Sequence, residues 1–123
     1  NYPEKLINNT YAGIPVRSKS EVLIANALFS KHISFRYEAL LQLGSHSVYP
    51  DFTIQHPVTK KIYYWEHLGM MSEEDYLDSA LTKIRRYCRN NIYPGGNLIL
   101  TYESRETPLD SKLVLHIIDH YFS

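Results

Sequence analysis

The segment from residue 61 to residue 102 constrains the fold more than any other part of the chain. It contains a strand-like stretch at 61–68, a helix-like stretch at 72–90, and the strongly apolar stretch NLILTY at 97–102. A short, apolar run of this kind is typical of a strand that is buried on both faces. A strand that joins a sheet through a helical crossover runs parallel within that sheet. The segment therefore predicts a sheet with a parallel pair and a helix packed on one face.

The remaining elements complete an α/β domain. A helix is expected from Ser18 to about residue 32, followed by strands at 35–43 and 48–56 that form a hairpin. A last helix is expected to begin at Thr107, with Pro108 at its first position. The expected order is α-β-β-β-α-β-α, which describes a central mixed four-stranded sheet flanked by helices.

Two stripes of side chains run along the helix expected at 72–90. The first is apolar and is predicted to be the buried stripe: Leu77, Leu81, Ile84 and Cys88. The second lies about 100° around the helix from the first and could reach over the edge of the sheet: Tyr76, Ala80, Lys83 and Tyr87.

Composition limits the class of protein. The 123 residues suit one domain, and 13 Lys and Arg against 13 Asp and Glu leave no net charge that would favour a polyanion globally. The single cysteine, Cys88, excludes an internal disulfide and favours a reducing, cytoplasmic setting. The chain shows no signal-peptide pattern and no apolar run long enough to span a membrane. Because it does not begin with Met, we expect residues 1–123 to be one domain of a longer protein, with a further N-terminal domain or a protein partner.

Two carboxylates interrupt neighbouring strands. Side chains alternate along a strand, so Asp51 shares a face with Thr53, and Glu66 shares a face with Tyr64. If the two carboxylates lie on the same side of adjacent strands, their charges repel unless a cation lies between them. Mg²⁺ prefers oxygen ligands of this kind, and the backbone carbonyl of His67 could add another.

These residues lie in a recognisable context, made of the stretches RSKSEVLIANAL, YPDF and YWEHLGMM. The chain resembles the PD-(D/E)XK, or restriction-endonuclease-like, nuclease superfamily, in a branch with Glu-x-x-Gly in place of Glu-x-Lys. The resemblance implies a phosphodiesterase that depends on Mg²⁺ or Mn²⁺ and acts mainly on DNA, with RNA as a further possible substrate. It implies that Asp51 and Glu66 hold the metal and that Glu21 is an accessory ligand or positions a water.

One position departs from the pattern of the superfamily. The lysine that normally lies two residues after the glutamate is Leu68 in this chain. We expect Lys83 to supply the missing positive charge, because some members of the superfamily take their lysine from the following helix. Lys19 is a further candidate, whereas the His67 side chain should point away from the carboxylates.

Structural roles compete with these functional ones. Glu21 suits a helix-capping box with Ser18, and Glu66 could form a salt bridge to Lys60, Lys61 or Lys83. Basic residues at Arg17, Lys19 and Arg86 could contact nucleic-acid phosphates, although a charged helix face is often only solvated. Leu68 also supports an alternative function, a catalytically inactive module that binds nucleic acid or a protein partner.

Overall fold

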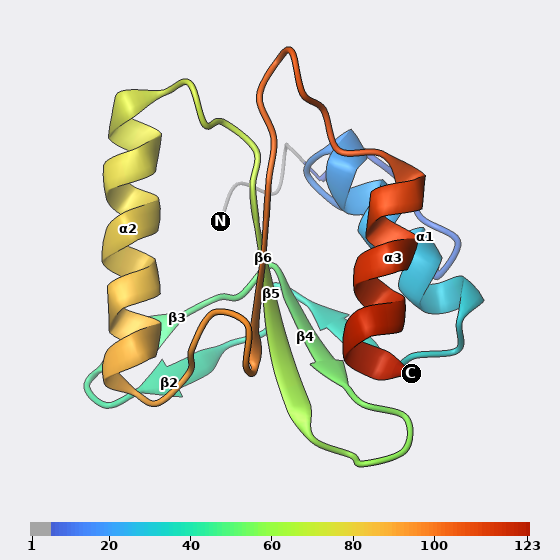
Figure 1. Cartoon of the computed structure of the whole chain (residues 1–123), viewed down its shortest axis with the longest axis horizontal. Helices are drawn as coiled ribbons and strands as arrows, with labels where there is room; N and C mark the ends of the chain where they lie inside the picture. The colour runs from blue at the N-terminus through green and yellow to red at the C-terminus, as the bar shows by residue number, and fades with distance from the viewer. Residues whose placement is uncertain (1–5) are drawn as a thin grey trace.

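The computed structural model describes residues 6–123, which form a single small α/β domain with three helices and a mixed four-stranded sheet (Figure 1). None of the helices in this range is long and apolar enough to cross a membrane. The elements in chain order are α1 (Lys19–Ser30), β1 (Phe35–Tyr37), β2 (Leu41–Leu43), β3 (His46–Val48), β4 (Phe52–Gln55), β5 (Ile62–Leu68), α2 (Glu74–Arg89), β6 (Leu98–Tyr102) and α3 (Ser111–Phe122).

The main sheet has the strand order β1-β4-β5-β6. Strand β4 runs antiparallel to both β1 and β5, and β5 runs parallel to β6. The helical crossover through α2 therefore produces the predicted parallel pair, and the prediction of a mixed four-stranded sheet is confirmed. The register places Phe52 opposite Trp65 and Trp65 beside Ile99.

The prediction of two long hairpin strands at 35–43 and 48–56 is wrong, because each stretch is broken in the middle. Glu38 has a left-handed backbone with φ of 49°, which ends β1, and Pro50, which has no amide hydrogen, lies between β3 and β4. The side chain of Glu38 is held by a bidentate ion pair with Arg17, at 2.7 and 3.0 Å. Strands β2 and β3 consequently pair only with each other, in a separate two-stranded sheet.

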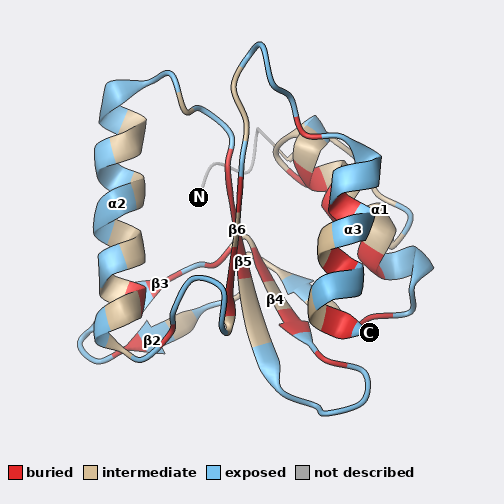
Figure 2. Cartoon of the chain, in the orientation of Figure 1, coloured by how far each residue is buried: buried red, intermediate tan, exposed pale blue. Residues whose placement is uncertain are grey.

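Helices α1 and α3 cover one face of the main sheet and enclose the larger core (Figure 2). Ser18 caps α1 as predicted, with its hydroxyl accepting a hydrogen bond from the Glu21 amide. The prediction that the last helix begins with Pro108 is wrong. Asp110 is the N-cap of α3, and its carboxylate accepts from the Leu113 amide at 2.9 Å. Fully or almost fully buried members of this core include Ile24, Leu28, Phe52, Ile54, Trp65, Ile99, Val114 and Ile118.

Helix α2 lies on the opposite face, and the predicted orientation of this helix is wrong. Leu81, which belongs to the stripe predicted to be buried, is 52% exposed, whereas Tyr87 of the second stripe is fully buried. Tyr87 packs in a smaller core with Leu43, Val48 and Leu98. Leu77, Ile84 and Cys88 of the first stripe are half-buried, so Leu81 is the one residue of that stripe that faces solvent. The helix is rotated toward its second stripe, where Tyr87 and Lys83 have a partner in Glu66 on the sheet.

Candidate active site

Asp51 and Glu66 lie next to each other on the α2 face of the sheet. The pairing of Phe52 with Trp65 places Asp51, one residue earlier, across from Glu66, one residue later. Residues opposite each other on antiparallel strands point to the same face. Asp51 is half-buried at the start of β4, and Glu66 is 5% exposed within β5. The structure thus brings together the two carboxylates that the sequence singled out.

Each carboxylate is anchored through one oxygen. Asp51 Oδ2 accepts a hydrogen bond from the backbone amide of His67 at 2.7 Å. Glu66 Oε2 accepts from the Tyr87 hydroxyl at 2.5 Å and lies 2.8 Å from the Lys83 amine. Within residues 6–123, neither Asp51 Oδ1 nor Glu66 Oε1 receives a hydrogen bond. Two fixed carboxylates therefore each keep an oxygen that can coordinate a cation.

Asp51 lies in a setting that disfavours its ionised form. Burial raises the pKa of Asp51 well above its ordinary value, and the nearby charges of Glu66 and Glu21 raise it further. The hydrogen bond from the His67 amide and the charge of Lys83 act in the opposite direction but do not cancel these effects. A bound cation would offset the repulsion from Glu66 and Glu21.

Lys83 reaches the carboxylates from α2. Its amine pairs with Glu66 and also donates to the backbone carbonyl of Tyr49 at 3.1 Å. The position two residues after Glu66 is occupied by Leu68, which is 9% exposed and supplies no charge. The structure therefore places the Lys83 charge beside Glu66.

Three tyrosines hold the site together, and sequence reasoning did not identify them. Tyr87 donates to Glu66, and Tyr37 donates to Glu21 at 3.0 Å. Tyr76 accepts from the Gly69 amide and donates to the His67 carbonyl, at 3.0 and 3.3 Å. The spacing of Tyr76 and Tyr87 with Lys83 on one helical stripe was the available signal.

The backbone and side chain of His67 serve different faces of the sheet. Its amide holds Asp51, and its carbonyl, the predicted metal ligand, has the Tyr76 hydroxyl as a weak partner. Its imidazole points to the α1 and α3 face, as strand alternation predicts. There Nδ1 lies 2.7 Å from Thr101 Oγ1, and Nε2 lies 2.5 Å from Glu103 Oε1. Only the backbone of His67 can therefore contribute to a metal site with Asp51.

The polar network around the His67 ring is structural. The ionised Glu103 carboxylate can only accept, so His67 Nε2–H donates to it, and Nδ1 of the neutral ring then accepts from the Thr101 hydroxyl, which itself accepts from the Trp65 indole at 3.0 Å. Ser20 also donates to Glu103. Burial alone would raise the pKa of Glu103, but the hydrogen bonds from Ser20 and His67 outweigh it and lower that pKa. The network ties α1 to the ends of β5 and β6.

Glu21 has the capping role considered for it, and its role as an accessory ligand or water-positioning group stays a prediction. Its Oε1 accepts from the Ser18 hydroxyl at 3.1 Å and from the Tyr37 hydroxyl, so it belongs to the helix cap. Burial raises the pKa of Glu21 despite these hydrogen bonds. Its charge also reaches Asp51, where it raises the pKa. Glu21 therefore belongs to the electrostatic environment of the carboxylate pair.

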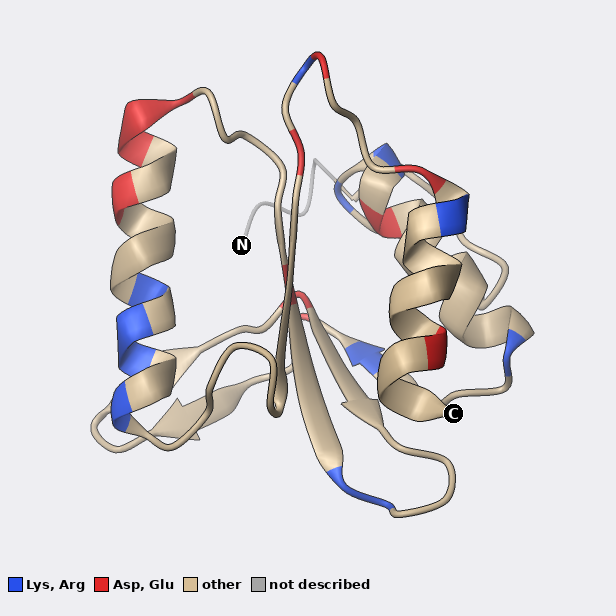
Figure 3. Cartoon of the chain, in the orientation of Figure 1, with Lys and Arg blue, Asp and Glu red and all other residues tan. Residues whose placement is uncertain are grey.

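The residues proposed to contact phosphate lie in three different settings. Arg17 is engaged by Glu38, which raises the pKa of the guanidinium, and Lys19 is exposed at the start of α1. Arg86 is half-buried on α2 and has no ion-pair partner within residues 6–123. Figure 3 shows the Lys and Arg positions gathered along the second half of α2. Only Arg86 and its neighbours on that helix therefore combine positive charge with closeness to Lys83.

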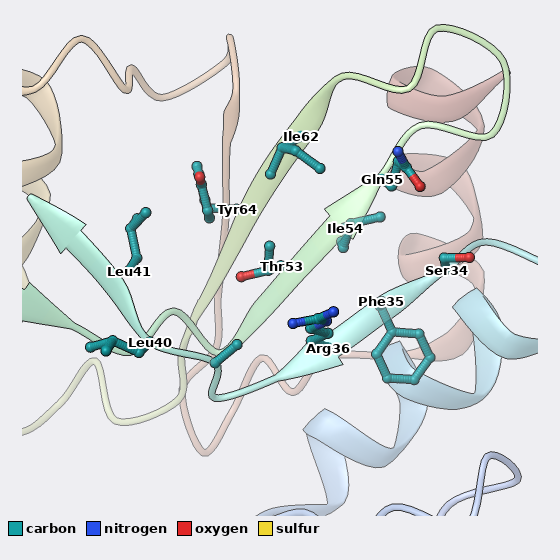
Figure 4. Close-up of a pocket in the computed structure, with 11 residues that line it drawn as sticks. Ser34, Phe35, Arg36, Leu40, Leu41, Thr53, Ile54, Gln55, Ile62 and Tyr64 are labelled. Carbon is teal, nitrogen blue, oxygen red and sulfur yellow. The ribbon is translucent and has the colours of Figure 1, made fainter.

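A separate groove of about 490 Å³ lies on the part of the sheet that α2 leaves uncovered (Figure 4). Its walls include Leu40 and Leu41 on one side and Thr53 and Tyr64 on the other, and Arg36 is its one charged lining residue. No carboxylate lines this groove. This groove therefore offers no acidic ligand for a cation, unlike the carboxylate pair.

The donor atoms at the carboxylate pair suit a hard divalent cation. Carboxylate and carbonyl oxygens are the ligands that Mg²⁺ and Mn²⁺ prefer, and such sites commonly use only one or two carboxylates. Within residues 6–123 there is no group of three or more His, Cys, Asp or Glu side chains placed to hold a metal ion. Zn²⁺, which favours such groups, fits this site poorly.

Comparison of this chain with protein-family models, with curated proteins and with solved structures finds no match.

Proposed function

We propose that this domain is a restriction-endonuclease-like nuclease that uses Mg²⁺ or Mn²⁺ to hydrolyse phosphodiester bonds in DNA. One observation carries the proposal. Asp51 and Glu66 face each other on neighbouring strands, each with an unengaged oxygen, and the Lys83 amine lies 2.8 Å from Glu66. Two acidic groups and one basic group on adjoining rigid elements match what metal-assisted phosphodiester hydrolysis requires.

Asp51 Oδ1, Glu66 Oε1 and the His67 carbonyl would hold the ion. When bound, a divalent cation neutralises phosphate charge and lowers the pKa of a coordinated water. The chain's own contribution is to keep these oxygens fixed. The His67 amide orients Asp51, and the Tyr87 hydroxyl orients Glu66.

Lys83 would steady the charge that develops on the phosphate. In the overall reaction a water oxygen forms a bond to phosphorus, one phosphorus–oxygen ester bond breaks, and the leaving oxygen takes up a proton. An ammonium group has three N–H donors, and Lys83 donates one of them to the Tyr49 carbonyl while its charge pairs with Glu66. A remaining N–H can donate to a phosphate oxygen or to the attacking water, a role worth about 10²–10³ in rate.

The alternative is an inactive module that binds nucleic acid or a protein partner. The observation in its favour is that Lys83 and Glu66 already neutralise each other in the absence of ligand. Asp51 argues against it, because without a cation its ionised form faces the repulsion of Glu66 and Glu21.

The deciding experiment is a cleavage assay on linear, circular and single-stranded DNA. Wild-type protein should cut at least one substrate with Mg²⁺ or Mn²⁺, and a chelator or the variant Asp51→Ala should abolish cutting. Lys112→Ala, on the exposed surface of α3, is the control and should cut like wild type.

Two results would overturn this function. Cutting that persists in the chelator or in Asp51→Ala would remove the metal mechanism. A folded wild-type protein that cuts no substrate under any of these conditions would favour the inactive module.

A further inference from the structure

A groove of about 460 Å³ runs between strand β3 and helix α2. Ser47 and Val48 of β3 form one wall, and the other wall belongs to α2. The α2 residues lining it are Asp78, Ser79, Thr82, Lys83 and Arg86. Lys83 lines this groove and also pairs with Glu66, so the Lys83 side chain joins the groove to the carboxylate pair.

The groove offers hydrogen-bond donors that the protein does not use itself. The Arg86 guanidinium forms no ion pair within residues 6–123, and the Ser79 hydroxyl forms no hydrogen bond in the same range. By contrast, the Ser47 hydroxyl donates to Gln42 at 2.8 Å, and the Thr82 hydroxyl donates to the Asp78 carbonyl at 3.0 Å. Available donors are thus concentrated at Arg86 and Ser79, which lie two helical turns apart on one side of α2.

The chemistry of the lining selects one part of a nucleic acid. No aromatic side chain lines this groove, so it has no platform on which a base could stack. A guanidinium and a hydroxyl are the common donors to phosphate oxygens. Arg85 and Arg89, also on the second half of α2, add positive charge nearby (Figure 3).

We propose that the groove between β3 and α2 binds the sugar-phosphate backbone of the nucleic-acid strand next to the phosphate that is hydrolysed, with Arg86 and Ser79 as the principal contacts. The proposal rests on the proposed function, because it is the carboxylate pair beside Lys83 that makes the neighbouring groove a substrate path. Contacts to phosphate position a strand without reading its bases. The groove would therefore hold DNA without sequence preference.

Asp78 allows a second, independent test of this groove. It lines the end away from Arg86, and its carboxylate repels phosphate there. Removal of this charge should strengthen binding, whereas removal of the Arg86 charge should weaken it. A merely structural role of the two side chains would not produce opposite effects.

The test measures binding without catalysis. A fluorescein-labelled 16-nucleotide single strand and the corresponding duplex are titrated with protein in EDTA, and binding is followed by fluorescence anisotropy at several salt concentrations. Arg86→Gln should weaken binding about 5–10-fold on every sequence tried and reduce the slope of log K against log salt by about 1. Asp78→Asn should tighten binding about 2–5-fold, and Ser79→Ala should weaken it about 2–5-fold. Lys112→Gln, on α3, is the matched charge control and should bind like wild type.

The outcomes separate this proposal from the proposed function. If wild type cuts DNA but Arg86→Gln and Asp78→Asn bind like wild type, the groove proposal is wrong and the nuclease proposal stands. If the variants shift binding as expected but wild type never cuts, the groove binds the nucleic-acid backbone in an inactive module, and the nuclease proposal fails. Failure of wild type to bind either DNA at low salt overturns the groove proposal. So does an effect of Lys112→Gln as large as that of Arg86→Gln.

Discussion

The two faces of the main sheet are formed by the same strands but differ in their side chains. One face is apolar and covered by two helices, and the other carries charged groups under a single helix. On the α1 and α3 face, Trp65 and Ile99 are sealed under two helices, and the polar groups near them are bonded to one another. On the α2 face, Asp51 and Glu66 repel each other, and a single helix covers only part of the sheet. The sealed face stabilises the fold, and the open face carries charges that a ligand could relieve. Stability and function should therefore respond separately to mutation.

The largest expected effect is at Asp51, where mutation should lower DNA cleavage and raise the stability of the fold. Because burial raises the pKa of Asp51, its ionised form destabilises the folded state above that pKa. Asp51→Asn removes the charge, and the amide oxygen can still accept from the His67 amide. We expect DNA cleavage to fall by at least about 10³-fold, while the free energy of unfolding in EDTA at pH 8 rises by on the order of 1 kcal/mol. Urea denaturation and a cleavage assay measure the two quantities.

A decrease in the stability of Asp51→Asn would contradict the comparison, because it would show that the carboxylate stabilises the fold. The control is Asp119→Asn, an exposed carboxylate on α3 with a long pairing to Lys31 at 3.5 Å. That variant should leave cleavage unchanged and alter stability by less than about 0.5 kcal/mol.

The second prediction contrasts core residues of the two faces. Ile118 on α3 is 1% exposed, whereas Leu81 on α2 is 52% exposed. Ile118→Ala should destabilise the protein by roughly 2–5 kcal/mol, because it leaves a cavity in the larger core. Leu81→Ala should change stability by no more than about 0.5 kcal/mol. Equal losses in thermal or urea denaturation would show that Leu81 is buried, as its helical spacing had suggested.

The contrast between Leu81 and Tyr87 also shows what sequence patterns can and cannot predict. The alternation of side chains predicted which residues share a face with Asp51 and which with Glu66, because a period of two is inherent in any strand. That the two carboxylates lie on the same face depended on the register, which pairs Phe52 with Trp65. The orientation of α2 was not predictable from hydrophobic periodicity. The buried Glu66 needs a hydroxyl and an ammonium partner, and these lie on the Tyr87 and Lys83 stripe rather than on the Leu81 stripe.

The breaks in the strands and the contacts between residues far apart in the chain could not be predicted from the sequence either. Glu38, where the strand is interrupted, forms an ion pair with Arg17, 21 residues earlier in the chain. The bond from His67 to Glu103 spans 36 residues and leaves no periodic signal. Local patterns describe element type and facing, whereas the partners of buried polar groups are settled only when the elements pack together.

The third prediction concerns Tyr87, which packs in the smaller core and also donates a hydrogen bond to Glu66 of the candidate site. Tyr87→Phe removes the hydroxyl that donates to the buried Glu66 and keeps the ring that fills the smaller core. A hydrogen bond to a charged group contributes roughly 1.5–3 kcal/mol, so the free energy of unfolding of the variant should fall by an amount within this range. Tyr93→Phe, at a half-exposed tyrosine in the turn before β6, is the control. If both variants lose the same stability, the Glu66 bond is not what holds α2 in its orientation.

The smallest expected effect is a difference in how acid acts on the two faces. The pKa of Glu103 on the sealed side is lowered, so its ionised form stabilises the folded state at pH values above the ordinary glutamate value of 4.5. That contribution is lost as the pH falls through the lowered pKa, whereas Asp51, with its raised pKa, responds to acid in the opposite direction. Glu103→Gln should therefore be less stable than wild type by about 1 kcal/mol or less at pH 7, and the difference should shrink as the pH falls below 4.5. Urea denaturation from pH 7 to pH 3 checks this, with the exposed Glu106→Gln as control. If the stability difference grew on acidification, protonated Glu103 rather than the carboxylate would be the form that holds Ser20 and His67. The two faces of the sheet would then respond to acid in the same direction.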